Sequence, residues 1–280
     1  MKQFFAIIIT LLVAHNASAW SGAIHSGIAA IADANLTADA KSAIDEALEG
    51  HSIIYYAHWM DDVADSETHK HTKSWHNVAI TPKNVPLSAK KAAKSKVKGA
   101  SNALALEGLV TAINALTNRS ALTTQQVADN IRYIVSIVCD LHCPPHYIFT
   151  DTPAWSDVTY TLAGNKHTLK YSAFWEYSAI RHTFIWKTQE FVHQLSRKSP
   201  EQVAALTAGS ITDWVSRNAE QYRVVLGMME SGAHFNERTF RLWNNKIYPI
   251  STEIVATAGY RLAAILNSLF DEKAPRVKTK

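Results

Sequence analysis

The feature of this sequence that most restricts its fold is helical periodicity, which recurs along nearly the whole chain. Apolar residues repeat at spacings of three and four, which places them on one face of a helix. The chain has 280 residues, of which 47% are hydrophobic and 19% charged. This balance supports a large buried core and excludes a disordered or fibrous chain. The predicted helices are Ile24–Ala32, Ala38–Leu48, Ala103–Leu116, Val127–Leu141, Phe174–Leu195, Val203–Val215, Gln221–Met229 and Ile254–Leu269.

Capping residues agree with this helical pattern. Thr37, Thr124 and Ser199 each stand where a helix is expected to begin, and their side chains can accept hydrogen bonds from the first turn. The only strand-like segments are Asp157–Leu162 and Lys166–Lys170, which predict a small β-hairpin in a loop. No repeat or low-complexity linker interrupts the chain. The sequence therefore predicts an all-α, single compact multi-helix domain with a small β-hairpin in a loop.

The N-terminal residues 1–19 have the pattern of an export signal. Lys2 precedes an apolar run from Phe4 to Ala14, which is too short to span a bilayer as a stable helix. Ala17-Ser18-Ala19 matches the small-x-small pattern of a cleavage site. A membrane anchor is the alternative interpretation. We expect cleavage between Ala19 and Trp20, and a secreted or periplasmic protein with no stable membrane span.

Charge is mildly positive overall and concentrated in one segment. The formal net charge is +4 and the chain has 13 histidines. Residues 83–98 carry six lysines, which form either a solvated face or a patch that attracts phosphate. Residues 271–280, which contain Pro275 and several basic residues, are expected to be a flexible tail.

One predicted helix carries a polar stripe on an otherwise apolar sequence. Its members are Asp129, Arg132, Ser136 and Asp140. Asp129 and Arg132 can pair with each other, but burying the remainder is costly unless something satisfies it. Asp140 is followed closely by His142 and His146. Carboxylate and imidazole groups at one helix end are typical of a metal site, although histidine is also favoured there by the helix dipole.

Further motifs along the chain support metal chemistry when they are taken in order. They are Trp20-x4-His25, Trp59-Met60-Asp61-Asp62, Trp75-His76, Asp140-x-His142-x-Pro144-x-His146, Phe174-Trp175-Glu176 and Ala258-Gly259-Tyr260-Arg261-Leu262-Ala263. This series resembles the single-strand-specific zinc nuclease and 3′-nucleotidase family, whose fold zinc-dependent phospholipase C shares. The resemblance covers nearly the whole chain after the signal peptide. It implies a zinc nuclease-like helical domain over residues 20–270.

The resemblance also implies which residues hold zinc. The family has a trinuclear zinc site in which the N-terminal tryptophan of the mature chain binds through its amine and carbonyl. Carried over to this sequence, the first zinc would be held by Trp20, His25 and Asp140. The second would be held by Asp61, His76 and the shared Asp140. Asp61 would also act as the catalytic residue that orients the attacking water. The third zinc would be held by His146 and Glu176.

Two ligand positions of the family are occupied by serine here. Ser136 stands where the family has a histidine that binds the second zinc, and Ser172 where a histidine binds the third. A neutral hydroxyl is a poor zinc ligand. We therefore expect two zinc ions rather than three, with His142 and His167 considered as substitute ligands.

These features predict an exported metal-dependent hydrolase of phosphodiesters. The resemblance implies a nuclease or 3′-nucleotidase that hydrolyses single-stranded RNA or DNA and nucleotides by metal-activated water, with an altered zinc site and reduced activity. Two alternatives remain open. One is a catalytically weakened or inactive family member that binds a metal or a phosphate ligand. The other is an enzyme of the phospholipase C type that acts on phospholipid, an expectation supported by Glu176.

Overall fold

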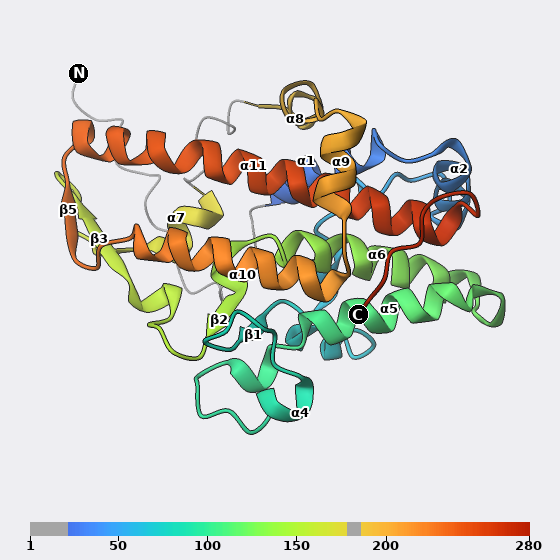
Figure 1. The fold of residues 1–280 in the computed structure, drawn as a ribbon, viewed down its shortest axis with the longest axis horizontal. Helices are drawn as coiled ribbons and strands as arrows, with labels where there is room; N and C mark the ends of the chain where they lie inside the picture. The colour runs from blue at the N-terminus through green and yellow to red at the C-terminus, as the bar shows by residue number, and fades with distance from the viewer. Residues whose placement is uncertain (1–21, 178–185) are drawn as a thin grey trace, which may run out of the picture.

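A computed structural model describes residues 22–177 and 186–280, and helices make up most of this part of the chain (Figure 1). The prediction of an all-α protein with only small β elements is confirmed. The predicted signal peptide, residues 1–19, and Trp20 lie outside the described residues. No helix in the described ranges is long and apolar enough to cross a membrane.

The longest helix, α11 (Glu237–Phe270), runs along the long axis of the molecule (Figure 1). Helices α1 (Gly22–Asp33), α2 (Ala38–Ala47), α6 (Thr124–Asp140), α8 (Thr188–Leu195) and α9 (Pro200–Thr207) pack against it. Gly259 permits the close approach of α1, because a Cβ atom there would lie 2.4 Å from Cγ2 of Ile31. A side chain at this position would overlap the core.

The remaining described helices surround this core. Helix α5 (Ala105–Thr117) packs along α6, and α3 (Trp59–Val63) crosses the same helix. Helix α10 (Ile211–Gly227) has 17 residues, as many as α6. The shorter elements are η1 (Lys70–Ser74), α4 (Ala89–Ala92), η2 (Ala100–Asn102), η3 (Arg119–Ala121), η4 (Pro144–His146), η5 (Trp155–Asp157) and α7 (Tyr171–Tyr177).

Helix boundaries follow their capping residues. Thr37 and Ser199 cap α2 and α9 as predicted, whereas α6 is capped by Thr123 and not by Thr124. Thr123 forms a capping box with Gln126, which satisfies two otherwise unpaired amide groups. A side chain can cap only from outside the first turn, so the cap lies one residue earlier than predicted.

Four predicted helices are wrong in extent. Ile254–Leu269 is only the second half of α11, which begins at Glu237. Phe174–Leu195 is not continuous, because residues 186 and 187 are not helical and α8 begins only at Thr188; residues 178–185 lie outside the described part. The predicted helix Val203–Val215 is broken at Gly209, whose φ of +83° takes the chain out of α9 before α10 begins. Gln221–Met229 is the second half of α10 and not a separate helix.

Two short parallel strands bring distant segments together below α6. Strand β1 (Val78–Ile80) pairs with β2 (Tyr147–Phe149), with Val78 opposite Tyr147. The pairing was not predicted, because three-residue strands are too short to show a period in the sequence. It sets His76, two residues before β1, beside His146, directly before β2.

The predicted hairpin is confirmed and carries a third strand. Strand β3 (Thr159–Leu162) pairs antiparallel with β4 (Leu169–Lys170) and parallel with β5 (Ala233–Phe235). This sheet lies at one end of α11 (Figure 1). The segment expected to be a flexible tail makes specific contacts, since the amide groups of Ile211 and Thr212 donate to the carbonyl groups of Lys278 and Thr279.

Candidate metal and catalytic site

The centre of the candidate site is Asp140, the last residue of α6, whose side chain is fully buried. The other half of the predicted polar stripe behaves as expected, because Arg132 pairs with Asp129 at 3.0 Å. An ionised carboxylate in the core is costly unless opposite charges or hydrogen bonds compensate it. The groups around Asp140 therefore determine what this site can do.

His25 approaches Asp140 from α1. Its Nδ1 lies 2.9 Å from the carbonyl oxygen of Ala57, and because a carbonyl only accepts, Nδ1 carries the hydrogen. The lone pair of Nε2 is then directed toward Oδ1 of Asp140, 3.5 Å away. A backbone hydrogen bond that fixes the ring in this way is typical of metal-binding histidines.

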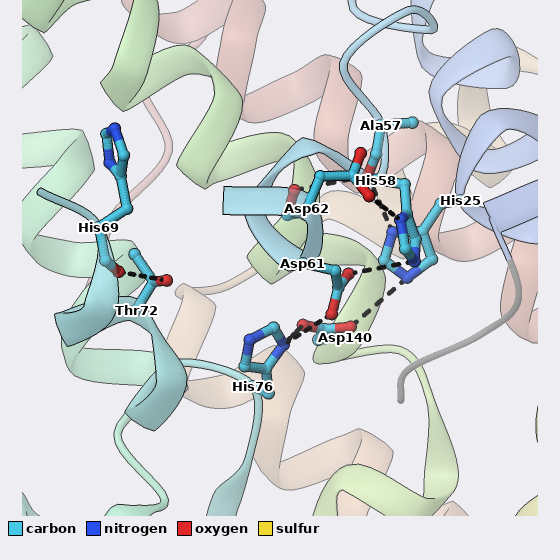
Figure 2. A network of polar contacts seen from close by, with 10 residues as sticks. His25, Ala57, His58, Asp61, Asp62, His69, Thr72, His76 and Asp140 are labelled. Atoms are coloured by element: carbon cyan, nitrogen blue, oxygen red, sulfur yellow. Dashed lines mark hydrogen bonds and ion pairs between the residues drawn. The ribbon is translucent and has the colours of Figure 1, made fainter. Parts of the chain in front are cut away.

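His76 and Asp61 complete the contacts of Asp140 on its other side. His76 Nδ1 lies 2.8 Å from Oδ2 of Asp140 and 3.8 Å from Oδ1 of Asp61. Figure 2 shows the three side chains pointing toward one another, with His25 reaching the same carboxylate from the opposite side. Asp61 belongs to α3, and its side chain is 19% exposed to solvent. Asp61 and His76, which is 14% exposed, are the members of these three that solvent can reach.

His146 lies at the inner edge of the same group. Its ring is buried, hydrogen-bonds to the main chain of His76 and lies 6.4 Å from the His76 ring, centroid to centroid. Its Nδ1 has no hydrogen-bond partner. The β1–β2 pairing therefore brings the imidazole rings of His76 and His146 close to each other.

The predicted zinc ligands His25, Asp61, His76, Asp140 and His146 are thus brought together, from α1, α3, the start of β1, α6 and η4. Trp20 lies outside the described residues, and so does the side chain of Glu176, although its backbone belongs to α7. In residues 22–177 and 186–280, no three His, Cys, Asp or Glu side chains are already arranged around a metal position. Instead, the side chains bond to each other.

The donor atoms nevertheless fit a bound cation. Four buried polar atoms in this group have no hydrogen-bond partner: His25 Nε2, Asp61 Oδ2, Asp140 Oδ1 and His146 Nδ1. Unpaired buried polar atoms are rare in folded proteins and require an explanation. Two imidazole nitrogens and two carboxylate oxygens form a donor set that zinc accepts.

Burial and the two carboxylates set the protonation of the group. Burial disfavours charge on His25 and His76, but Asp140 and, more weakly, Asp61 outweigh it, so both imidazole pKa values lie above the ordinary value. Burial also disfavours ionised Asp140, yet His146 and His76 hold its pKa well below the usual range. The pKa of His146 itself is lowered by burial. The site therefore keeps an anionic centre that attracts positive charge.

The two serines differ from the histidines in what they contact. Ser136 is fully buried, and its hydroxyl donates weakly, at 3.4 Å, to the carbonyl oxygen of Ala57, which also accepts from His25. Ser172 is buried in the first turn of α7. Neither hydroxyl provides a ligand of the kind that an imidazole would supply.

The substitute ligands considered from the sequence do not face the group. His142 Nδ1 donates to the carbonyl oxygen of Val138, and its Nε2 accepts from Arg261 at 3.1 Å. Burial, with a smaller contribution from Arg261, lowers the pKa of His142 to about 3. His167 is exposed in the loop between β3 and β4. His142 instead belongs to a buried network that Arg261 extends to Asn218.

One residue of the group was missed from the sequence. His58 precedes α3, and its Nε2 lies 3.4 Å from Oδ2 of Asp61 (Figure 2). Its ring also stands edge-on to His25, with centroids 5.6 Å apart. Its position three residues before Asp61 is the one signal in the sequence, since that spacing brings side chains together on a helix.

A comparison with protein families identifies the family of this chain. A family model described as S1/P1 Nuclease matches residues 20–271. The match spans all the residues gathered here around Asp140. Curated proteins provide no match to the chain.

Proposed function

Because this chain belongs to the S1/P1 nuclease family, we propose that it is an exported, zinc-dependent phosphodiesterase that hydrolyses single-stranded nucleic acid and nucleoside 3′-phosphates. The observation that carries the proposal is the buried Asp140 carboxylate between His25 and His76, with four unpaired buried donor atoms around it. Such a group has no evident purpose as a purely structural element. It fits a pair of cations that share one carboxylate.

The proposed site has two metal positions, each defined by residues that face each other. His25 and Oδ1 of Asp140 face each other, and Trp20, freed by cleavage of the signal peptide, would complete that position. Asp61, His76 and Oδ2 of Asp140 face each other at the second position. Zinc pairs about 3.5–4 Å apart supply an activated water and neutralise the charge of the reacting phosphate. His146 and Glu176 are too few to hold a third ion tightly.

Asp61 is the proposed catalytic side chain. It combines a buried, unpaired Oδ2 with partial exposure of the carboxylate as a whole. One oxygen can therefore remain in the cluster while the other accepts a hydrogen bond from an incoming water. Holding that water in line with the phosphorus is the contribution expected of such a group.

A polyanionic substrate suits the surface charge. All six lysines of residues 83–98 are exposed in the loops around α4 and η2. Lysines that neutralise backbone phosphates attract nucleic acid irrespective of sequence. Half-buried Trp59, the first residue of α3, and half-buried Trp75 both pack against Tyr133 and are candidate stacking surfaces for unpaired bases.

A weakened catalyst is the second candidate, and the two serines favour it. Ser136 is turned toward a backbone carbonyl, and Ser172 removes an imidazole from the position of the third ion. A lost ion removes electrostatic stabilisation of the transition state, which is worth several kcal/mol. We therefore propose two zinc ions per chain and a reduced rate.

Side-by-side assays test these candidates. Protein that begins at Trp20 is incubated with single-stranded RNA, single-stranded DNA, a nucleoside 3′-monophosphate and phosphatidylcholine, with and without a chelator. Turnover of the nucleic-acid substrates that is lost with chelator and restored by Zn²⁺ is expected. Cleavage of phosphatidylcholine alone would make the protein a phospholipase, and zinc binding without turnover would make it a non-catalytic member.

Two variants separate the catalytic carboxylate from general charge effects. Asp61→Asn should lower kcat by about 10²-fold or more, because an amide cannot accept the proton of the attacking water. Asp65→Asn is the matched control, since Asp65 lies four residues further on, is 95% exposed and pairs with Lys73. Equal rates in the two variants would remove Asp61 from the mechanism.

A further inference from the structure

The imidazole of His58 is oriented by one carboxylate and faces another. Its Nδ1 lies 3.4 Å from Oδ1 of Asp62, and its Nε2 lies 3.4 Å from Oδ2 of Asp61. Asp62 is 69% exposed, whereas Oδ2 of Asp61 is buried and has no hydrogen-bond partner. Because carboxylates only accept, a neutral ring directs its hydrogen to one of them. With the hydrogen on Nδ1, the Nε2 lone pair faces the unpaired oxygen.

Two lone pairs that face each other repel, and a cation between them removes the repulsion. The separation of the two atoms fits this explanation. Zinc binds imidazole nitrogen and carboxylate oxygen at about 2.0–2.2 Å in tetrahedral geometry, which places two such ligand atoms about 3.3–3.5 Å apart. The observed 3.4 Å between His58 Nε2 and Asp61 Oδ2 lies in that range.

His58 follows directly on a backbone carbonyl that two side chains of the group contact. The hydroxyl of Ser136 donates to the carbonyl oxygen of Ala57, the residue directly before His58. The same carbonyl orients His25, and the rings of His25 and His58 contact edge to face. The segment that Ser136 and His25 contact therefore carries the imidazole of His58.

The His58 ring packs against α1 but remains partly exposed to solvent. A Cβ atom at Gly22 would contact it at 3.7 Å, an ordinary packing distance, so the first turn of α1 lies against one side of the ring. The side chain is 36% exposed. It can therefore adjust by a few tenths of an ångström without disturbing the core, as a metal ligand at the rim of a pocket must.

We propose that His58 is a zinc ligand and supplies, through Nε2, the imidazole that Ser136 cannot provide to the ion held by Asp61, His76 and Asp140. This inference rests on the proposed zinc-dependent function. Ser136 then does not weaken the second metal position, because a histidine elsewhere in the sequence supplies the fourth protein ligand. The third position has no comparable replacement among the described residues.

Metal binding, measured without reference to activity, tests the proposal. Zn²⁺ content per chain and affinity are determined for the protein that begins at Trp20, for His58→Ala and for His58→Gln, the latter filling more of the space. Both variants should lose one ion or bind it at least about 10–100-fold more weakly, the loss that even an outer partner of a metal ligand causes. The visible absorption of bound Co²⁺ should fall and shift in both.

The matched control is His193→Ala. His193 is 69% exposed in α8 and lies near Glu190 at the same three-residue spacing that separates His58 from Asp61, but far from Asp140 in the sequence. It should keep the zinc content of the unchanged protein. Melting of each metal-free variant confirms that it is folded, and only folded variants are scored.

The outcomes distinguish a failure of the proposed zinc-dependent function from a failure of the proposed ligand role of His58. If the unchanged protein binds no zinc, the proposed function fails. If it binds zinc and either folded His58 variant keeps full content, unchanged affinity and the same Co²⁺ spectrum, the ligand role of His58 is overturned while the zinc-dependent function stands. In that case the contacts with Asp61 and Asp62 position the ring without a metal ion.

Discussion

His76 and Asp140 are 64 residues apart in the sequence, yet their side chains are joined by a 2.8 Å contact between Nδ1 and Oδ2. The contact exists because the β1–β2 pairing fixes the chain just after His76 against the chain just after the end of α6. A three-residue strand pair thus sets the position of these side chains. The Asp140 carboxylate, which both His25 and His76 contact, is the centre of the group.

Replacement of that carboxylate should empty both metal positions. In Asp140→Asn the amide cannot bridge two cations, and we expect zinc content near zero with a fall in kcat/KM of about 10³-fold or more, equivalent to several kcal/mol. Elemental analysis of the purified protein measures the zinc. Asp129→Asn, on the same helix but paired with Arg132, serves as the control. Full zinc occupancy in Asp140→Asn would refute the shared site.

Ser172→His should add a metal ion. The substitution returns an imidazole to the first turn of α7, where His146 and Glu176 are the remaining candidate ligands. We expect zinc content to rise by one ion per chain, because a third nitrogen or oxygen donor completes a protein ligand set of the usual size. Ser156→His, which adds an imidazole at an exposed position of η5, controls for adventitious binding. Unchanged stoichiometry would mean that the serine is not what limits the third position.

Gly259→Ala should destabilise the fold by about 1–3 kcal/mol, the usual cost of overpacking a core. The added methyl group would overlap Ile31 and approach the carbonyl oxygen of Ile28 to 3.2 Å, and α1 would have to move away from α11. Gly227→Ala is the matched control, because nothing lies within 4 Å of its Cβ position and alanine suits the end of α10. Denaturant titration of both variants measures the difference, and equal midpoints would contradict the packing argument.

Acid should destabilise the metal-free protein through His142. Burial, with Arg261 as the smaller cause, lowers its folded pKa to about 3, against roughly 6.5 in the unfolded chain. Between these values the unfolded chain binds the extra proton, so this stability is complete above pH about 6.5 and is lost as the pH falls toward 3. The effect is on the order of a few kcal/mol.

Denaturant titration in chelator from pH 7 to pH 4 checks this dependence. His142→Asn should reduce the slope of unfolding free energy against pH, although it lowers stability at neutral pH by removing contacts with Val138 and Arg261. Exposed His193→Asn provides the comparison. If the unfolding free energies of the His142 variant and the unchanged protein fall equally with decreasing pH, another group causes the loss of stability in acid.

The sequence by itself determined the helical class and predicted residues that the fold brings together. Long amphipathic segments such as α1 and α6 are visible because their period is local, and caps such as Thr37 mark their starts. The ordered motifs pointed to Asp61, His76 and Asp140, which do meet in the folded chain. These features depend on residue types and short spacings, which a sequence displays directly.

Only the tertiary structure decided which histidines face the carboxylates of Asp140 and Asp61. His142 stands two residues after Asp140 but turns to Arg261, whereas His58 turns to Asp61 from a segment that no motif had marked. The break at Gly209 likewise became visible only as a positive φ between α9 and α10. The direction of a side chain depends on what packs around it from distant segments, and local periodicity carries no record of those contacts.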